Sequence, residues 1–431
     1  MYALRPAFDT VADMIGKGKK VPESLLEIFA QNPEYSAKLD SLINAKDKVP
    51  FKIFDKKNAE KLFGKNLNIS ASQLEKFNLC RFSYFCNYGL NVRERQRAEI
   101  NPMQYGTIVH YILERFFGEY TKEEYLSLEE DKFQKIVCAY LAEYAVKYFG
   151  EEQLESNSFT YRLKTILDNV MYLMKHIMEE LSQSEFFVAD CELKIGEDIP
   201  SYTIVLPDGH KIAVCGSVDR VDIMQRADIT YLRIIDYKTG TKQFKLSDIL
   251  YGINLQMLLY LHSIEASGSD KYGEIVPAGI LYMPATVPYI SSDSLKSIDK
   301  LPDELNKKLK MNGLLLKDTE IIHGMDKTDA ATYIPVKIKA GEPVSSTSLA
   351  TLAEFGKIFK KVDMLIAEMG KNIYNGNIEA KPLKGGHDSC EYCPYDSVCA
   401  YRQSNPITCF SVDNKTVIEE ITNEINGKEE E

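Results

Sequence analysis

The sequence is marked first by features that it lacks. No apolar run among its 431 residues is long enough to cross a bilayer, and the start, MYALRPAFDTVADMIGKGKK, lacks the uninterrupted apolar segment of a signal peptide. The chain also has no G-x-x-x-x-G-K-[ST] motif, which excludes a P-loop nucleotide-binding motor within it. We therefore expect a cytoplasmic protein with no P-loop engine of its own.

An excess of positive charge is also absent. The formal net charge is -11, from 52 Lys and Arg against 63 Asp and Glu, which argues against indiscriminate binding to nucleic acid. A local basic channel is still compatible with this sum, because the field at a cleft depends mainly on nearby charges. Short basic runs are usually solvated faces, and three occur here, at residues 17–20, 91–97 and 306–310.

The first half of the chain has the spacing of helices. Hydrophobic residues make up 45% and charged residues 27%, so the chain can bury a substantial core over about two or three domains. Residues 1–69 suggest short helices with polar connections, and either Ser70 or Ser72 is placed to cap the helix that follows. Residues 104–184 repeat apolar side chains at helical spacing, so this half is expected to be mostly helical.

The pattern changes to short strands near residue 186. Segments rich in β-branched residues run from there to TYLRIIDYKTG, which ends at Gly240, and are broken by the turn PDG. A helix is expected over 253–267 and a further strand over 278–288. Several antiparallel strands, a crossover helix and another strand predict an α+β or mixed α/β core.

Acidic residues cluster where two of these strands end. Asp236 and Lys238 in IIDYKTG are two residues apart and share one face of the strand. If the preceding strand is the hairpin partner, its Asp219 faces Asp236, and two close carboxylates are costly unless a cation or proton lies between them. Oxygen ligands in an open site suit Mg²⁺ or Mn²⁺, and a lysine beside such an ion fits phosphodiester hydrolysis.

A simpler interpretation of these residues stays open. Asp236 and Lys238 could form an ordinary ion pair at the end of a strand, with Asp219 and Arg220 in a turn.

Four short motifs in this order resemble the RecB-like branch of the PD-(D/E)xK nuclease superfamily. They are GTIVH (106–110), GSVDRVD (216–222), IIDYKTG (234–240) and QMLLY (256–260). The resemblance implies a restriction-endonuclease-like core, in which a mixed central sheet is flanked by helices. It also implies the following site: metal ligands His110, Asp219, Asp236 and the Tyr237 carbonyl, a catalytic Lys238, DNA contacts from Gln256 and Tyr260, and, less firmly, a further acid at Glu192. Without the resemblance, the residues favour a helix histidine packed against Tyr111 and Phe116 as the interpretation of His110.

The nine cysteines suggest thiols or metal ligands, because the chain has no secretion signal. Cys390, Cys393 and Cys399 stand in a C-x2-C-x5-C arrangement that needs a fourth ligand, for which Cys80 is the candidate. Two alternatives stay open: a zinc site in which His387 joins the three cysteines, and a cluster in which Cys86 replaces Cys80. The other thiols considered, Cys138, Cys191 and Cys215, lie in apolar surroundings and are expected in the core.

The cysteine layout resembles that of AddB-type nucleases. Further likenesses are KLFGKNLNISASQLEKFNLCRFSYFCNYGL and GLLLKDTEIIHGMD, at 313–326. The resemblance implies a 4Fe-4S cluster that staples the two ends of the nuclease domain together. It also implies a Mg²⁺-dependent exonuclease that acts on single-stranded DNA ends beside an AddA-type helicase-nuclease subunit in double-strand break repair. The alternatives are a non-catalytic DNA-binding scaffold and a stand-alone Cas4-like exonuclease.

This resemblance also suggests a division of the chain. Its expected parts are a helical leader (1–69) left from a helicase-like region, a nuclease domain (70–410) with a core (104–288), an insertion (289–347) and a cysteine segment (385–410), and a polar tail (411–431).

Overall fold

The computed structural model describes most of the chain. The described residues are 4–16, 19–44, 52–93, 102–150, 156–240, 243–288, 301–345, 347–399, 401 and 406–429. Parts of the following segments singled out above therefore lie outside them: 17–20, 91–97, 289–347 and 385–410.

The chain forms two compact units, which are described separately. Unit 1 consists of residues 1–64, 79–93 and 371–409, and unit 2 of residues 65–78, 94–370 and 410–431. Unit 1 thus combines the expected leader with the cysteine segment, and unit 2 holds the expected core. No helix among the described residues is long and apolar enough to cross a membrane.

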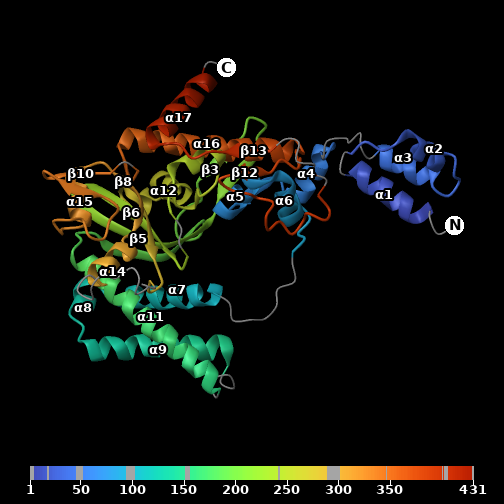
Figure 1. Ribbon diagram of the computed structural model, residues 1–431. Helices are drawn as coiled ribbons and strands as arrows, with labels where there is room; N and C mark the ends of the chain where they lie inside the picture. Colours follow the sequence, from blue (N-terminus) through green and yellow to red (C-terminus); the bar gives the residue numbers. More distant parts are fainter. Residues whose placement is uncertain are drawn as a thin grey trace. The chain divides into compact units, whose positions relative to one another are not determined.

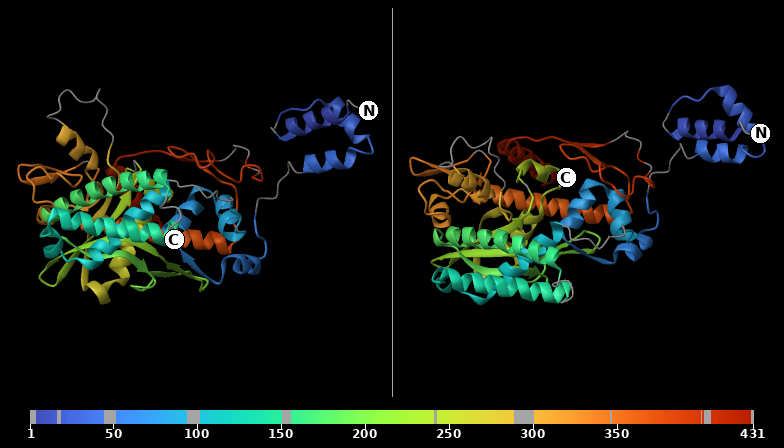
Figure 2. Two further views of the ribbon diagram at one scale, coloured as in Figure 1. Left: turned by 90° about the horizontal axis from the view of Figure 1, so that it is seen from below. Right: turned by 60° about the horizontal axis from the view of Figure 1, so that its bottom comes forward.

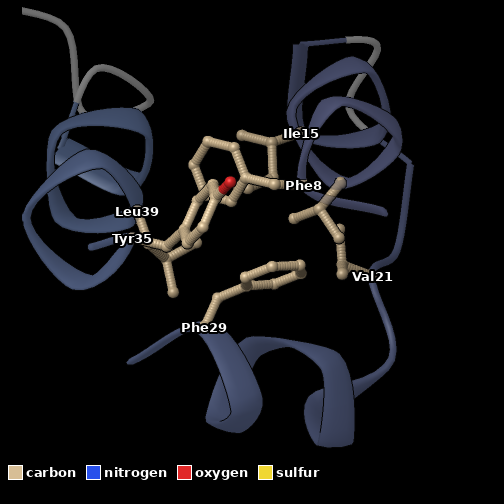
Figure 3. Close-up of a cluster of buried hydrophobic side chains, with 7 residues drawn as sticks. Phe8, Ile15, Val21, Phe29, Tyr35 and Leu39 are labelled. Carbon is tan, nitrogen blue, oxygen red and sulfur yellow. The ribbon is translucent and has the colours of Figure 1, made fainter. Parts of the chain in front are cut away.

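A three-helix bundle opens unit 1, as the short amphipathic segments of the leader predict. Its helices are α1 (Leu4–Gly16), α2 (Glu23–Ala30) and α3 (Ser36–Asn44). Each helix supplies apolar side chains to one buried cluster, in which the rings of Phe8 and Phe29 meet edge to face at 5.1 Å (Figure 3). Tyr35 packs against both rings, so the bundle has a small core of its own.

The rest of unit 1 brings together segments that are far apart in sequence. Its elements are α4 (Lys56–Phe63), α6 (Arg81–Tyr84), the π-helix η1 (Phe85–Gly89), β12 (Leu383–Gly385) and β13 (Ile407–Cys409). Asp55 caps α4 by accepting a hydrogen bond from the Lys57 backbone N–H. The Tyr395 hydroxyl donates to the Val92 carbonyl at 2.7 Å, which ties the two cysteine-bearing segments to each other.

Unit 2 is built on a six-stranded mixed sheet. The strand order is β11-β8-β7-β6-β5-β2. The strands are β2 (Phe187–Ile195), β5 (Gly216–Arg226), β6 (Ile229–Lys238), β7 (Glu274–Pro284), β8 (Asn312–Leu316) and β11 (Leu349–Ala350). β5 and β6 form an antiparallel hairpin, and β7 runs parallel to β6 after the crossover helix α12, so the predicted mixed sheet is confirmed.

Helices cover both faces of this sheet (Figure 1). Two helices belong mostly to unit 2: α5 (Ala71–Leu79) and α16 (Leu352–Tyr374). The helices that lie entirely in unit 2 are α7 (Pro102–Glu119), α8 (Lys122–Leu126), α9 (Glu130–Phe149), α11 (Asn157–Ser182), η2 (Leu246–Tyr251), α12 (Gln256–Ser267), α13 (Ser269–Tyr272), α14 (Leu301–Leu309), α15 (Thr319–Met325) and α17 (Asn414–Glu429). In α11, buried apolar residues recur every three or four positions, at Val170, Leu173, Met174, Ile177 and Leu181. Helices α7, α9 and α11 lie on one side of the sheet, and α12 and α16 on the other (Figures 1 and 2).

Short strands pair outside the main sheet. A three-stranded sheet consists of β1 (Asn66–Ile69), β4 (Lys211–Val214) and β3 (Thr203–Val205). A separate pair is formed by β9 (Lys337–Lys339) and β10 (Glu342–Val344). Ser70 caps α5, since its backbone N–H donates to Gln73 Oε1 and its hydroxyl accepts from the Gln73 N–H.

Two segments differ from the sequence-based expectation. The insertion expected at 289–347 contains β8, which pairs with β7 in the main sheet, because Leu314, Leu315 and Leu316 are buried like any core strand. The expected polar tail forms α17, since Val417 and Ile421, one turn apart, give it a buried stripe.

Candidate metal site at the fork of two strands

The candidate site lies where β5 and β6 separate. Their hydrogen-bonded ladder ends at the pair Arg220 and Ile235, so Asp219 and Asp236 occupy the next positions on the two strands. Asp219 Oδ2 accepts a hydrogen bond from the Tyr237 backbone N–H at 2.9 Å, in place of the ladder. The hairpin that the sequence suggested therefore brings the two acids to one end of the sheet.

His110 on α7 reaches this fork. Its Nε2 lies 3.7 Å from Asp219 Oδ2, and its Nδ1 lies 2.9 Å from Glu192 Oε1 on β2. Ligand atoms of these three residues all lie within 4.8 Å of one another. A histidine nitrogen and two carboxylate oxygens at this spacing are a donor set that fits a divalent cation.

Glu192 reaches the site through an irregular backbone. The register of β2 against β5 shifts between Val188 and Asp190, and Glu192 has φ 51, a left-handed conformation that is strained for a non-glycine residue. The neighbouring pairs place Glu192 opposite Asp219, and the Ser217 hydroxyl donates to Glu192 Oε2 at 2.9 Å. Ser217 did not stand out in the sequence, although it lies within the GSVDRVD motif.

The acids of the fork carry more negative charge than the basic groups beside them balance. Burial, and then the charge of Asp236, raise the pKa of Asp219 to about 7, although His110 and the Tyr237 N–H act in the opposite direction. Burial by itself lowers the pKa of His110, but the hydrogen bond to Glu192 and the surrounding carboxylates raise it overall. Burial raises the pKa of Glu192, and the hydrogen bonds from His110 and Ser217 outweigh it, so that pKa is lowered.

Asp236 and Lys238 are already paired with each other. Lys238 Nζ lies 2.6 Å from Asp236 Oδ2, and Asp236 is almost fully buried. The ion pair of the simpler interpretation is thus formed, but Asp219 and Arg220 lie in β5 and not in a turn. Asp236 stands beside the group of His110, Glu192 and Asp219 and acts on it through its charge.

Tyr237 contributes differently from its two neighbours. Its hydroxyl accepts a hydrogen bond from Arg220 Nη1 at 3.1 Å, within the buried side of the sheet. Its ring meets the His110 ring edge to face at 5.8 Å. The side chain of Tyr237 is thus engaged within the buried side of the sheet, and its backbone N–H donates to Asp219.

Gln256 and Tyr260 lie on α12, one turn apart. Gln256 is the first residue of this helix, and Tyr260 is buried. A Cβ on Gly216 would come within 2.2 Å of Tyr260 Oη, so a glycine is needed at the start of β5. Burial raises the pKa of Tyr260 to about 12, a backbone hydrogen bond from Ala71 acts in the opposite direction, and the charges of Asp219 and Asp236 add to the rise.

A buried ion-pair network behind the fork was missed in the sequence. It joins two arginines and two acids, all fully buried: Glu180, Arg220, Asp222 and Arg233. Arg233 Nη2 lies 2.6 Å from Glu180 Oε1 and 2.9 Å from Asp222 Oδ2. An arginine in the apolar strand TYLRIID was the signal that could have indicated it.

All nine cysteines are free thiols, and six of them lie in unit 1. Cys80 and Cys86 belong to a buried cluster with Tyr395, and Cys393 and Cys399 pack against it. Burial raises the pKa of Cys80, backbone hydrogen bonds from Ser83 and Phe82 act in the opposite direction, and the charge of Cys399 raises it further.

Cys390 is linked to Cys393 by a backbone hydrogen bond, in which the Cys393 N–H donates to the Cys390 carbonyl at 3.3 Å. Burial raises the pKa of Tyr401, and both Cys390 and Cys80 contribute to this effect through their charges. His387, which the alternative zinc site requires, is exposed. Cys86 lies in the same buried cluster as Cys80, and the charges of Cys399, Cys393 and Cys80 all raise its pKa in addition to burial.

Comparison with known proteins assigns the family. Residues 68–400 match the family described as the PD-(D/E)XK nuclease superfamily. The chain is similar to a subunit of an ATP-dependent helicase/deoxyribonuclease from Thermoanaerobacter pseudethanolicus, with 34% identity over 354 residues, which are 79% of this chain and 30% of the relative. It is 32% identical to the protein of the same name from Ruminiclostridium cellulolyticum, over 94% of this chain and 37% of the relative.

A third relative with this name, from Clostridium kluyveri, is 35% identical over 88% of this chain and 34% of its own length. The chain spans about a third of the length of these curated relatives. Because the family match extends over most of the sequence and includes every residue of the fork, the chain belongs to the PD-(D/E)XK nuclease superfamily.

Proposed function

We propose that this chain hydrolyses DNA phosphodiester bonds with Mg²⁺ or Mn²⁺, as an exonuclease acting on single-stranded ends. The observation that carries the proposal is the convergence of His110, Glu192 and Asp219 beside the Asp236–Lys238 pair. The name of the relatives, which describes part of a helicase and deoxyribonuclease, supports DNA as the substrate.

Each residue of the fork has a role in this proposal. His110, Glu192, Asp219 and Asp236, with the Tyr237 carbonyl, would hold the metal. A divalent ion bound there supplies a Lewis acid and lowers the pKa of its water. Lys238, 28% exposed, carries the positive charge that orients the attacking water and offsets charge on the phosphate. Gln256 and Tyr260 would position the scissile strand.

The test is cleavage of an end-labelled single-stranded oligonucleotide by the full chain with and without Mg²⁺. Lys238→Ala and Asp236→Ala should each reduce the rate by about a thousandfold or more, because both remove charge at the reacting phosphate. Glu192→Gln tests the ligand that the sequence supported least. The matched control is Glu197→Gln, since Glu197 is a nearby acid that is 70% exposed.

Loss of cleavage in the site variants with an unchanged unfolding midpoint would support these roles. Full cleavage by Asp236→Ala or Lys238→Ala would remove the site assignment. A parent chain that binds DNA but cleaves nothing in Mg²⁺ or Mn²⁺ would favour the scaffold alternative.

We also propose that Cys80, Cys390, Cys393 and Cys399 bind a 4Fe-4S cluster. The support is the gathering of Cys80 with the C-terminal thiols in one unit. Anaerobically purified protein should contain iron and sulfide and absorb visible light, whereas a zinc protein is colourless. Cys80→Ser should abolish the absorption, and Cys86→Ser should not. The reverse result would show that Cys86, and not Cys80, is the fourth ligand of the cluster.

The third part of the proposal concerns the partner. The relatives carry the name of a subunit, so we expect this chain to act with an AddA-type helicase-nuclease subunit in double-strand break repair. Co-purification of tagged full chain with such a subunit tests this. Robust cleavage with no associated helicase would instead indicate a stand-alone exonuclease.

A further inference from the structure

A groove lined by lysines lies in unit 2 outside the fork. It has a volume of about 600 Å³ and is lined by residues of α14, β9, β10 and the adjoining loops. Four of its lining side chains are lysines, Lys307, Lys310, Lys337 and Lys339, and no acidic side chain lines it among the described residues. Such a surface is unexpected in a chain whose net charge is -11.

The groove is built and not formed by chance from loose side chains. Lys310 Nζ donates to the carbonyls of Ala331 at 2.7 Å and Val336 at 3.0 Å, which fixes the backbone that leads into β9. Lys337 and Lys339 are two residues apart on β9, so their side chains share one face of the strand.

Acids offset the charge of the two lysines nearest α14 more than that of the two on β9. Burial lowers the pKa of Lys310, and the charge of Asp326 acts in the opposite direction. Glu304 pairs with Lys307 at 2.7 Å, on the same helix. Glu342, the cross-strand partner of Lys339, accepts a hydrogen bond from the Thr319 hydroxyl at 2.7 Å. Ammonium groups facing one groove favour an extended anionic ligand, because a single charge could not satisfy them all.

One wall of the groove, at Lys310, lies near the end of the sheet that carries the fork. Asp236 pairs with Tyr282 on β7, and Tyr282 pairs with Asn312 on β8. Two strand spacings, about 10 Å, therefore separate Asp236 from Asn312, and Lys310 lies only two residues before Asn312. The Asn312 side chain also accepts from the Phe244 N–H at 2.8 Å, which ties β8 to the loop that follows Lys238.

From this geometry we propose that the groove binds the phosphate backbone of the DNA strand as it enters or leaves the fork. The inference rests on the proposed nuclease function and adds a second DNA contact to it. It also gives a role to the basic run at 306–310. An acidic polypeptide is the competing ligand, and the test includes it.

The test measures binding of a fluorescent single-stranded oligonucleotide to the full chain by anisotropy. EDTA is present, so binding is read independently of cleavage. Lys337→Gln/Lys339→Gln should weaken binding by about threefold to tenfold at low salt. It should also reduce the slope of log K against log salt by about 1.4, since each phosphate contact contributes about 0.7.

The matched control is Lys132→Gln/Lys135→Gln, which removes the same charge from exposed positions on α9. It should leave the slope unchanged. Equal slopes for the β9 variant and the parent would overturn the proposal, as would parent binding to polyglutamate that is as tight as to DNA and is lost in the β9 variant. Cleavage in Mg²⁺ is assayed separately, so failure of the nuclease proposal and failure of the groove are distinguishable.

Discussion

Asp219 and Asp222 lie three residues apart on β5, but the protein treats their charges in opposite ways. Asp222 is fully buried between Arg220 and Arg233, and with Glu180 on α11 the group has two acids and two bases. Asp219 instead shares its end of the strand with Glu192 and Asp236, and the bases within reach are His110 and Lys238.

The difference indicates which group is structural and which is open to a ligand. A buried acid whose charge is matched within the fold needs nothing further and loses stability when one partner is removed. A cluster of acids with incomplete compensation is costly until a cation enters it. The alternation of strand side chains makes this possible, because Asp219 and Asp222 point to opposite faces.

The largest expected effect on stability comes from breaking the buried ion-pair network of Glu180, Arg220, Asp222 and Arg233. Asp222→Ala would leave Arg220 and Arg233 buried with only Glu180, and breaking such a network costs about 3–5 kcal/mol in the free energy of unfolding. Urea unfolding followed by circular dichroism measures it. The control, Asp228→Ala in the exposed turn of the same hairpin, should change the free energy by less than about 0.5 kcal/mol. A parent-like midpoint for Asp222→Ala would show that the network does not stabilise the sheet.

Removing the charge of Asp219 is expected to stabilise the metal-free protein, whereas removing that of Asp222 destabilises it. The pKa of Asp219 rises from 3.8 unfolded to about 7 folded, so metal-free stability falls as the pH rises from about 4 to about 7 and stays low above that. Asp219→Asn keeps an acceptor for the Tyr237 N–H and should therefore stabilise the metal-free protein at pH 8 by about 1–4 kcal/mol. Thermal unfolding in EDTA measures this gain, and added Mg²⁺ should stabilise the parent more than the variant. If Asp219→Asn is less stable than the parent in EDTA, the acids of the fork do not carry a destabilising surplus of negative charge.

The sequence allowed much of this comparison to be predicted, but not all of it. The apolar β-rich segments suggested that the strands of Asp219 and Asp236 are hairpin partners, and the resemblance of the ordered motifs pointed to Asp219, Asp236 and Lys238. The placement of Glu192 depends on a register shift and a left-handed φ, which local propensity does not encode. The partner of Arg220 on α11, Glu180, lies 40 positions away in sequence, so only the folded chain shows that the charge is matched.

A second histidine sharpens the comparison by providing a structural counterpart to His110. His262 Nε2 lies 3.0 Å from Asp363 Oδ1, its Nδ1 lies 3.6 Å from Glu265 Oε2, and its ring stacks on Phe359. Burial lowers its pKa, but the two carboxylates outweigh burial and raise it to about 9.

Because the folded pKa of His262 is above the unfolded value of 6.5, its stabilisation is complete below about pH 6.5 and is lost as the pH rises to about 9. We expect a loss of about 1–3 kcal/mol over this range in the parent, and a smaller one in His262→Gln. Urea unfolding of both proteins at several pH values isolates the difference. Parallel pH profiles would show that the charge of His262 does not contribute.

The smallest effect is expected at the residue that connects the two groups. Tyr237 receives a hydrogen bond from Arg220 through its side chain, and its backbone N–H donates to Asp219. Tyr237→Phe removes only the first of these contacts, so it should cost about 1 kcal/mol of stability and leave the cleavage rate within about threefold of the parent. Urea unfolding and single-stranded DNA cleavage measure the two quantities on the same preparation. A large loss of cleavage at unchanged stability would mean that the balanced network positions the fork through this hydroxyl, and that the two groups are not independent.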